Sequence, residues 1–188
     1  MITPKKSLGQ NFLLDKNIIK KITELINIKN ENIIEVGPGY GALTDEIIKL
    51  KPKKLIIIEK DYELYLILKK KYKKSKITIL NKDVFNFNFN ELVNSKIISN
   101  LPYNISSKFI LKTIVLNNNI KEMICMIQKE LADKFDSKKG KMNKYKFISN
   151  YCTEYQINFT VSPKVFYPKP RVYSKVVKFL IKKKNFNL

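Results

Sequence analysis

Short apolar runs that alternate with helix-like segments are the feature that most restricts the fold of this chain. The runs contain few polar residues and lie at 33–36, 55–59, 77–80, 96–100 and 123–127. Runs of this kind are typical of strands that are covered on both faces, as in a parallel sheet. Because segments with helical periodicity separate them, the sequence predicts a doubly wound, mostly parallel α/β sheet of the Rossmann-like type.

The remaining elements fit one domain that spans residues 1–188. Asp15 is the expected N-cap of the first helix. Beyond residue 128, two strands at 156–161 and 176–181, joined across a proline-containing segment, predict an antiparallel addition that ends the sheet with an antiparallel edge strand. We expect helices at 16–27, 42–50, 61–72, 106–116 and 144–155.

A glycine-rich turn, Gly37-Pro-Gly-Tyr-Gly41, follows the first predicted strand and opens a helix, and Glu59 ends the next strand. Gly37 and Gly39 allow the backbone to approach a ligand closely, and a carboxylate at the position of Glu59 can accept both hydroxyls of a ribose. Pro38 removes a backbone donor that a pyrophosphate would need, which favours S-adenosyl-L-methionine over a dinucleotide. The alternative is a turn kept only for helix–strand packing.

Two further polar groups are expected at the carboxyl ends of later strands. Asp83 is placed to accept a hydrogen bond from an adenine amino group; taken by itself it suits a turn or N-cap role before Val84 and Phe85 better, and the neighbouring motifs favour the adenine contact. In Asn100-Leu-Pro-Tyr103, the Asn100 amide oxygen and a backbone carbonyl near Pro102 can accept from an exocyclic amine, while Tyr103 offers a flat face for a base. The alternative for this motif is a plain strand-to-helix turn.

The chain contains no histidine and only two cysteines, Cys125 and Cys152. The lack of imidazole excludes Ser-His-Asp and Cys-His nucleophilic sites. The cysteines form no Cys-x-x-Cys pattern, which predicts reduced buried thiols and neither a metal site nor a disulfide framework. No apolar stretch suits a bilayer span and the start lacks a signal-peptide core, so we expect a cytoplasmic protein with no membrane partner.

Lysine dominates the charge of this chain. The 188 residues contain 37 Lys and Arg and 16 Asp and Glu, which leaves a formal net charge of +21. Arg171 is the single arginine, so both coding bias toward lysine and selection for a polyanionic partner explain the excess. Lysine clusters at 69–76 and 182–184 are candidate RNA contacts, although the first also suits the C-terminal end of a helix.

Six ordered motifs resemble the ribosomal RNA adenine dimethyltransferases, the KsgA (RsmA) family, whose catalytic domain is a class I methyltransferase dependent on S-adenosyl-L-methionine. The resemblance runs from Ser7 to about Leu180, and its motifs are Gly9–Leu13, Glu35–Thr44, Ile58–Asp61, Asn100–Asn104, Gln128–Glu130 and Phe166–Ser174. It implies that residues 1–14 contribute to the cofactor site, with Gln10 and Asn11 along the methionine end. Family members usually continue into a helical C-terminal domain, which this chain is expected to lack.

The resemblance also implies a division of roles among the site residues. The target amine and base would be held by Asn100, Leu101, Pro102 and Tyr103, with Phe166 stacked on the opposite face of the base. The cofactor-binding set it implies is Gln10, Asn11, Leu13, Gly37, Gly39, Glu59, Lys60, Asp83, Val84 and Asn100. The cofactor leaves as S-adenosyl-L-homocysteine, and no metal is implied.

The implied substrate is rRNA within the small ribosomal subunit or an assembly intermediate, and two adjacent adenosines near the rRNA 3′ end would each receive two methyl groups. Large-subunit rRNA methyltransferases of the erythromycin-resistance type are the nearest alternative, and Pro38 with Leu101 favours the small-subunit branch. A catalytically silent nucleic-acid-binding or transcription factor on the same fold and a nicotinamide-dependent dehydrogenase are more distant alternatives. We expect a monomer.

Overall fold

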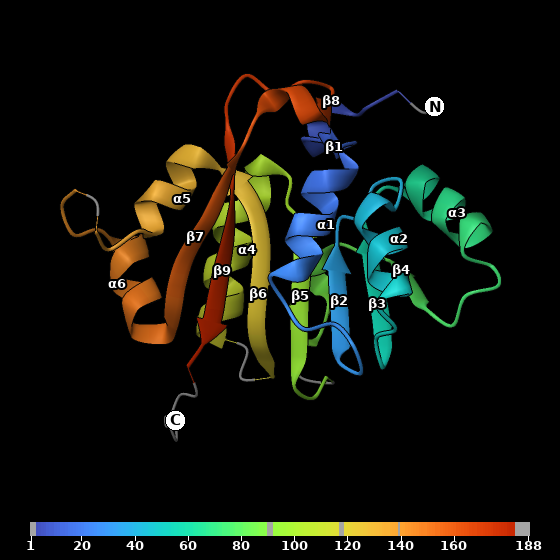
Figure 1. Cartoon of the computed structure of the whole chain (residues 1–188), viewed down its shortest axis with the longest axis horizontal. Helices are drawn as coiled ribbons and strands as arrows, with labels where there is room; N and C mark the ends of the chain where they lie inside the picture. Colours follow the sequence, from blue (N-terminus) through green and yellow to red (C-terminus); the bar gives the residue numbers. More distant parts are fainter. Residues whose placement is uncertain (1–2, 90–91, 117–118, 139, 183–188) are drawn as a thin grey trace.

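The computed structural model describes residues 3–89, 92–116, 119–138 and 140–182. A seven-stranded sheet runs through the middle of the molecule (Figure 1). Its strands are β2 (Asn32–Val36), β3 (Lys54–Glu59), β4 (Thr78–Asn81), β5 (Ser95–Asn100), β6 (Ile120–Gln128), β7 (Thr153–Val161) and β9 (Ser174–Ile181). Their order is β4-β3-β2-β5-β6-β9-β7, and a separate two-stranded pair, β1 (Phe12–Leu13) with β8 (Phe166–Tyr167), lies above the sheet in Figure 1.

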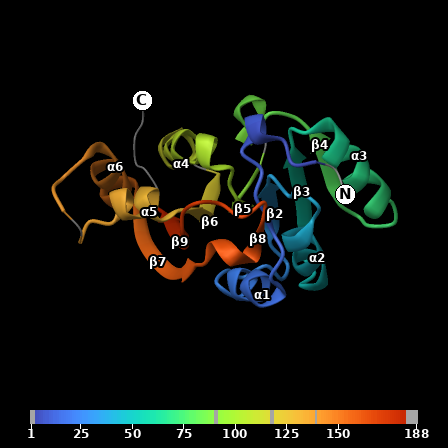
Figure 2. The same cartoon turned by 90° about the horizontal axis from the view of Figure 1, so that it is seen from above.

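Helices cover both faces of the sheet. They are α1 (Lys16–Glu24), α2 (Ala42–Lys49), α3 (Tyr62–Lys71), α4 (Tyr103–Leu116), α5 (Lys129–Phe135) and α6 (Lys144–Cys152). Viewed from above, α1 and α2 lie on one face and α4 on the other (Figure 2). The fold is therefore the doubly wound, mostly parallel α/β sheet that the sequence predicts.

The apolar strands are buried on both faces, as their composition indicates. In β2, Ile33 belongs to the buried cluster that contains Ile22 of α1 and Ile47 of α2, whereas Ile34 belongs to the cluster that contains Ile110 of α4. Each of these isoleucines is 2% exposed or less, so each contributes roughly 1.5–3 kcal/mol through burial. This two-sided packing fixes the position of β2 in the interior of the sheet.

Side-chain caps define where two helices begin. The Asp15 carboxylate accepts from Asn17 N at 2.8 Å and from Ile18 N at 3.0 Å, which confirms its predicted N-cap role. Asp61 caps α3 by accepting from Glu63 N at 3.0 Å. Both caps satisfy backbone donors that a helix start leaves without partners.

The chain reverses its winding direction between β2 and β5, which are parallel neighbours. Val36 at the end of β2 lies opposite Ser99 of β5, and the Ser99 hydroxyl donates to Val36 O at 2.6 Å. Ligands bind at such a switch point, at the carboxyl ends of the strands. The glycine turn and the Asn100 motif therefore lie side by side.

The antiparallel end of the sheet contains two strands. β9 pairs with both β6 and β7, so β9 is an interior strand and β7 forms the antiparallel edge. The predicted helix at 144–155 is too long at its C-terminal end, because Thr153 already pairs with Ile181 in the ladder and α6 ends at Cys152. Pairing with β9 overrides the helical preference of residues 153–155.

α4 begins at Tyr103, three positions before the predicted start. Pro102 O accepts from Ile105 N at 3.2 Å and from the Ser106 hydroxyl at 2.9 Å, which turns the chain into the helix directly after the proline. Proline is compatible with this position because its missing N–H is not needed there.

The described residues bear on two other expectations. Cys125 and Cys152 are both buried free thiols, as their spacing predicts. No helix in the described part of the chain has the length and apolarity needed to cross a membrane. Lys183 and Lys184 of the second lysine cluster lie outside the described residues.

Candidate functional site

A cavity of about 380 Å³ opens at the carboxyl ends of the strands, beside the switch point between β2 and β5. Its walls come from the N-terminal segment, the glycine turn after β2, the ends of β3 and β4, and the start of α4. All ten predicted cofactor-binding residues and the segment 100–103 line it. Residues that are far apart in the sequence therefore share one site.

The glycine turn needs its glycines for both backbone angle and space. Gly37, Gly39 and Gly41 have φ values of 67°, 59° and 82°, a region that other residues rarely adopt. A Cβ on Gly39 would press against the Phe12 ring, and one on Gly41 would collide with the Tyr72 hydroxyl. The turn can thus hold backbone N–H groups against a ligand while the protein packs closely behind it.

Glu59 supports this turn from the end of β3. Its carboxylate accepts from Asp61 N at 2.8 Å and from Gly39 N at 3.4 Å, and only 7% of the residue is exposed. Burial raises the pKa of Glu59 to about 7. Further hydroxyl donors from a ribose would stabilise the ionised form, because hydrogen bonds to a carboxylate favour its charge.

Asp83 has the local role that its turn position suggests. Its side chain caps the short 3₁₀ turn Val84–Asn86 by accepting from Phe85 N at 3.0 Å, and this bond holds the pKa of Asp83 below its usual value. Lys60 pairs with the second carboxylate oxygen at 2.9 Å. Asp83, Lys60 and the buried Val84 all line the cavity, so capping and cavity lining coexist.

The N-terminal segment is tied across the cavity by side-chain amides. The Gln10 amide accepts from Lys5 N at 2.8 Å and donates to Asp61 at 2.8 Å, so it is used within the protein. The Lys5 ammonium donates to the other oxygen of Asp61 at 2.8 Å. Asn11 presents its backbone oxygen to the Asn100 side chain at 2.9 Å. The N-terminal segment therefore connects the cofactor end of the site to the Asn100 motif.

The bond to Asn11 also fixes which way the Asn100 amide faces. Only the NH₂ group of an amide can donate to a carbonyl, so the Oδ1 atom of Asn100 remains available as an acceptor in the cavity. Pro102 O already accepts from two donors of α4. Among the described residues no group donates to Leu101 O, which makes it the backbone acceptor that can work with Asn100.

The two aromatic residues predicted for the base differ in their placement. The Tyr103 ring lines the cavity, and its hydroxyl lies 2.7 Å from the hydroxyl of Ser174 at the start of β9. Burial raises the pKa of Tyr103, which keeps this hydroxyl neutral. Phe166 is only 5% exposed, lies opposite Leu13 in the β1–β8 pair, and is not part of the cavity lining.

The hydroxyl of Tyr72 holds the glycine turn and is a contact that we did not predict. It lies 3.0 Å from Gly41 O and 2.7 Å from the Asp45 carboxylate. Burial raises the pKa of Tyr72 well above its usual range, so the hydroxyl keeps its proton. Nothing in the local sequence marks Tyr72, because it comes from the C-terminal end of α3, far from the turn in the sequence.

Tyr72→Phe is expected to raise the dissociation constant of S-adenosylhomocysteine about 3- to 10-fold, since loss of one net hydrogen bond loosens the turn. Isothermal titration calorimetry measures this change. Tyr62→Phe, on the exposed face of α3, is the matched control and should leave the affinity unchanged. Equal affinities for wild type and Tyr72→Phe would show that the turn is held without this hydroxyl.

Glu35 is a second missed residue, and a signal for it exists. It is a carboxyl group within the apolar run 33–36, directly before the glycine turn, and it is 1% exposed. Oε2 accepts from the Thr44 hydroxyl at 2.6 Å, while Oε1 has no partner among the described residues. Burial raises the pKa of Glu35 to about 8, so the group is largely protonated at neutral pH.

This pKa predicts a pH-dependent stability. Glu35 ionises near its ordinary pKa in the unfolded chain but only near 8 in the folded chain, so its contribution to stability is lost as pH rises between those values. We expect the free energy of unfolding in urea to fall from pH 5 to pH 8, and to fall less steeply in Glu35→Gln. The exposed control Glu154→Gln should keep the wild-type slope, and an unchanged slope in Glu35→Gln would contradict the assignment.

Charges at the cofactor end of the cavity are nearly balanced. Three lysines there meet a carboxylate within ion-pair distance: Lys5 with Asp61 at 2.8 Å, Lys60 with Asp83 at 2.9 Å, and Lys71 with Asp45 at 2.6 Å. Lys82 also lines this end and has no ion pair within the described part of the chain. With Glu59 nearby, this end can accept a ligand that carries positive charge. The chain's large net charge is therefore not concentrated at this end.

Comparison with known proteins identifies related chains. The family model "Ribosomal RNA adenine dimethylase" matches residues 1–188. A ribosomal RNA small subunit methyltransferase A from Malacoplasma penetrans is 42% identical over 95% of this chain and 66% of its own length. One from Pelagibacter ubique is 35% identical over the whole chain and 74% of its own length. The chain thus spans about two thirds to three quarters of these relatives.

Solved structures share the fold. A dimethyladenosine transferase from Plasmodium falciparum has a TM-score of 0.82 at 26% identity, and covers 94% of this chain and 66% of its own. The 23S rRNA methyltransferase ErmE has a TM-score of 0.83 at 22% identity over 92% of this chain and 70% of its own. The Mycoplasma capricolum (M. capricolum) protein TrmK, solved with S-adenosyl-homocysteine, has a TM-score of 0.64 at 14% identity over 94% and 73%.

Proposed function

Because the chain belongs to the ribosomal RNA adenine dimethylase family, we propose that it transfers methyl groups from S-adenosyl-L-methionine to adenosines of small-subunit rRNA. The proposed targets are the exocyclic N6 atoms of two adjacent adenosines near the rRNA 3′ end. The single observation that carries this proposal is the Asn100 amide: its NH₂ group is held by Asn11 O, which leaves Oδ1 as an acceptor on a residue that lines the cavity together with the glycine turn. An rRNA substrate is consistent with the proposed cytoplasmic location, and we keep the monomer as a proposal.

The residues of the cavity fit the proposed cofactor. The glycine turn offers backbone N–H groups to a cofactor that contains no phosphate. The Glu59 carboxylate already accepts two backbone hydrogen bonds and can still accept from the two hydroxyls of a ribose. Val84 and Asp83 would lie along the adenine, and the N-terminal segment would lie along the methionine end of the cofactor. When bound, S-adenosyl-L-methionine would supply a sulfonium methyl group that can pass to an attacking amine, with S-adenosyl-L-homocysteine as the leaving thioether.

Asn100 and Leu101 would act on the target amine through two acceptors. Hydrogen bonds from N6 to Asn100 Oδ1 and Leu101 O draw the amine lone pair out of conjugation with the ring and hold it in line for attack. Tyr103 provides a face for the base, and its hydroxyl bond to Ser174 keeps the ring from rotating. The proton then leaves to water, so no histidine is needed.

Transfer of labelled methyl from S-adenosyl-L-methionine to unmethylated small and large subunits, tested in parallel and followed by mapping of the labelled nucleotides, tests this function. The proposal predicts dimethylated adenosines in small-subunit rRNA only. Label confined to large-subunit rRNA would favour the erythromycin-resistance type. No label on either subunit, with S-adenosylhomocysteine still bound, would favour the catalytically silent alternative.

A further inference from the structure

Two exposed tyrosines belong to segments that border the cavity. Tyr167 is 48% exposed and lies opposite Phe12 in the β1–β8 pair, and Phe12 lines the cavity. Tyr173 is 53% exposed and directly precedes Ser174, whose hydroxyl holds the Tyr103 ring. Tyr167 is therefore attached to the cavity wall beside the glycine turn, and Tyr173 to the wall that holds Tyr103.

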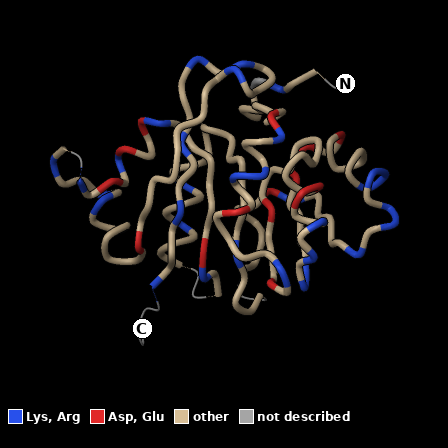
Figure 3. The backbone as a smooth tube through the Cα atoms, in the orientation of Figure 1, with Lys and Arg blue, Asp and Glu red and all other residues tan. Residues whose placement is uncertain are grey.

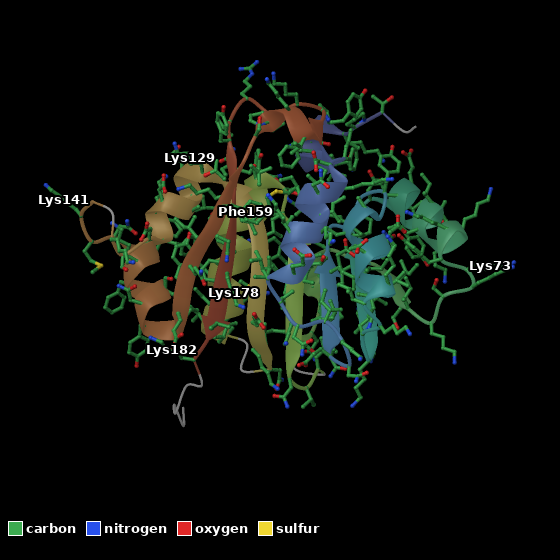
Figure 4. All side chains as sticks on the ribbon, in the orientation of Figure 1. Lys73, Lys129, Lys141, Phe159, Lys178 and Lys182 are labelled. Carbon is green, nitrogen blue, oxygen red and sulfur yellow. The ribbon has the colours of Figure 1, made fainter. Side chains whose placement is uncertain are left out.

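Three exposed cations without acidic partners are connected to these tyrosines, two by sequence and one by a backbone hydrogen bond. Lys129, Lys169 and Arg171 are exposed, and within the described part of the chain none of them lies within ion-pair distance of a carboxylate. Lys129 belongs to this surface because its backbone N donates to Tyr173 O at 2.9 Å, and its side chain points outward in Figure 4. At the cofactor end, Lys5, Lys60 and Lys71 are paired with carboxylates and only Lys82 is an unpaired cation among the described residues, so positive charge is less compensated on the side of the two tyrosines.

The sequence around these residues provides few acidic side chains that could neutralise them. No Asp or Glu occurs from position 155 to the end of the chain. In Figure 3 the connection between β7 and β9 carries blue segments, which are Lys and Arg, and no red segment, which would be Asp or Glu. Glu130, the neighbour of Lys129, is already paired with Lys134 at 2.7 Å. A ligand that binds here meets uncompensated positive charge.

We propose that Tyr167, Tyr173, Lys129, Lys169 and Arg171 form a flanking surface that holds the nucleotides on either side of the target adenosine. The tyrosine rings stack on neighbouring bases, and the three cations contact phosphates. Unpaired loop nucleotides suit this combination, because their exposed bases stack on aromatic rings while their backbone attracts cations. This inference rests on the proposed function and adds how the RNA is positioned at the site.

A protein partner fits the flanking surface less well. Three unpaired cations would have to be desolvated in a protein interface, which is costly unless the partner brings matching carboxylates. Single-stranded RNA brings one negative charge with every nucleotide and leaves much of the surface wet. Single-stranded RNA therefore provides, in one ligand, bases that stack on the tyrosine rings and phosphates that pair with the cations.

Alanine at either tyrosine tests the stacking. The probe is a fluorescent, unmethylated RNA hairpin whose loop contains two adjacent adenosines, titrated with the full chain in the presence of S-adenosylhomocysteine. We expect Tyr167→Ala and Tyr173→Ala each to weaken hairpin binding about tenfold, with an unchanged affinity for S-adenosylhomocysteine. Tyr151→Ala, on the outer side of α6 and 58% exposed, is the matched control and should bind as wild type.

The triple variant Lys129→Ala, Lys169→Ala, Arg171→Ala tests the phosphate contacts. Loss of three contacts should reduce the slope of log affinity against log salt by about 2. The control triple Lys29→Ala, Lys53→Ala, Lys54→Ala changes net charge equally near the amino ends of β2 and β3, away from the cavity, and should keep the wild-type slope. Equal slopes in both triples would overturn the phosphate contacts.

The outcomes separate this inference from the proposed function. Wild-type methylation of the hairpin together with unchanged binding by both tyrosine variants would overturn the flanking surface and leave the function intact. Tyrosine-dependent hairpin binding by a chain that transfers no methyl group to small subunits would support the surface and contradict the function. Binding that does not distinguish the hairpin from a duplex of equal length would also overturn the surface.

Discussion

Asn100→Ala is expected to lower the rate constant of methyl transfer by about 10²- to 10³-fold. The substitution removes an acceptor whose hydrogen bond strengthens as the amine becomes positively charged in the transition state. It also leaves Asn11 O without its donor, so we expect a cofactor affinity change of less than about tenfold. Single-turnover transfer to small subunits and calorimetric titration with S-adenosylhomocysteine measure the two effects.

Two further variants define the role of the Asn100 amide. Asn100→Asp keeps acceptor oxygens but cannot donate to Asn11 O and adds negative charge beside an RNA backbone, so it should also transfer methyl slowly. Asn150→Ala, on the exposed surface of α6, is the control and should be fully active. A loss of cofactor affinity as large as the loss of rate would contradict the division of roles.

Glu59→Ala is expected to have the opposite effect and to raise the dissociation constant of S-adenosylhomocysteine by about 10²-fold. A carboxylate that accepts from two ribose hydroxyls makes charge-assisted hydrogen bonds, each of which contributes about 1.5–3 kcal/mol. The rate of methyl transfer at saturating cofactor should change little in comparison. Calorimetry and single-turnover kinetics on the same preparation separate the two quantities.

The pKa of Glu59 makes this affinity depend on pH. The pKa is about 7 before the cofactor binds, and binding favours the ionised form, so the group must lose a proton at lower pH. The dissociation constant should rise by up to about tenfold per pH unit below pH 7 and level off above it. Glu59→Gln should bind more weakly without this dependence, and an equally steep dependence in that variant would contradict the assignment.

Much of the fold could be predicted because its signals are local. Apolar runs such as Leu55–Glu59 and Met123–Ile127 lie in parallel strands whose two faces are both covered, and few other arrangements bury such runs. The boundaries that were wrong lie where tertiary contacts override propensity, as at Thr153, which pairs with β9. The two-residue strands β1 and β8 could not be predicted, since no periodicity exists over that length.

The part of the candidate site that could be predicted consists of motifs whose residue types indicate what they bind. Glycines, a strand-end carboxylate and the Asn100 motif line one cavity because parallel strands end at the same edge of the sheet. The supporting contacts of Tyr72 and Ser174 depend on which distant elements pack against the motifs, and sequence spacing does not contain that information. The hydrogen bond from the Asn100 side chain to Asn11 O likewise joins residues far apart in the sequence, so sequence spacing does not predict it.

A crystal structure of the chain with S-adenosylhomocysteine and an adenosine-containing RNA loop is the most direct measurement of how the target amine is held. We predict that N6 of the adenosine lies about 2.7–3.2 Å from both Asn100 Oδ1 and Leu101 O, with the base against Tyr103. An adenosine bound in the cavity with N6 facing other groups, or an Asn100 side chain turned away from it, would contradict the account.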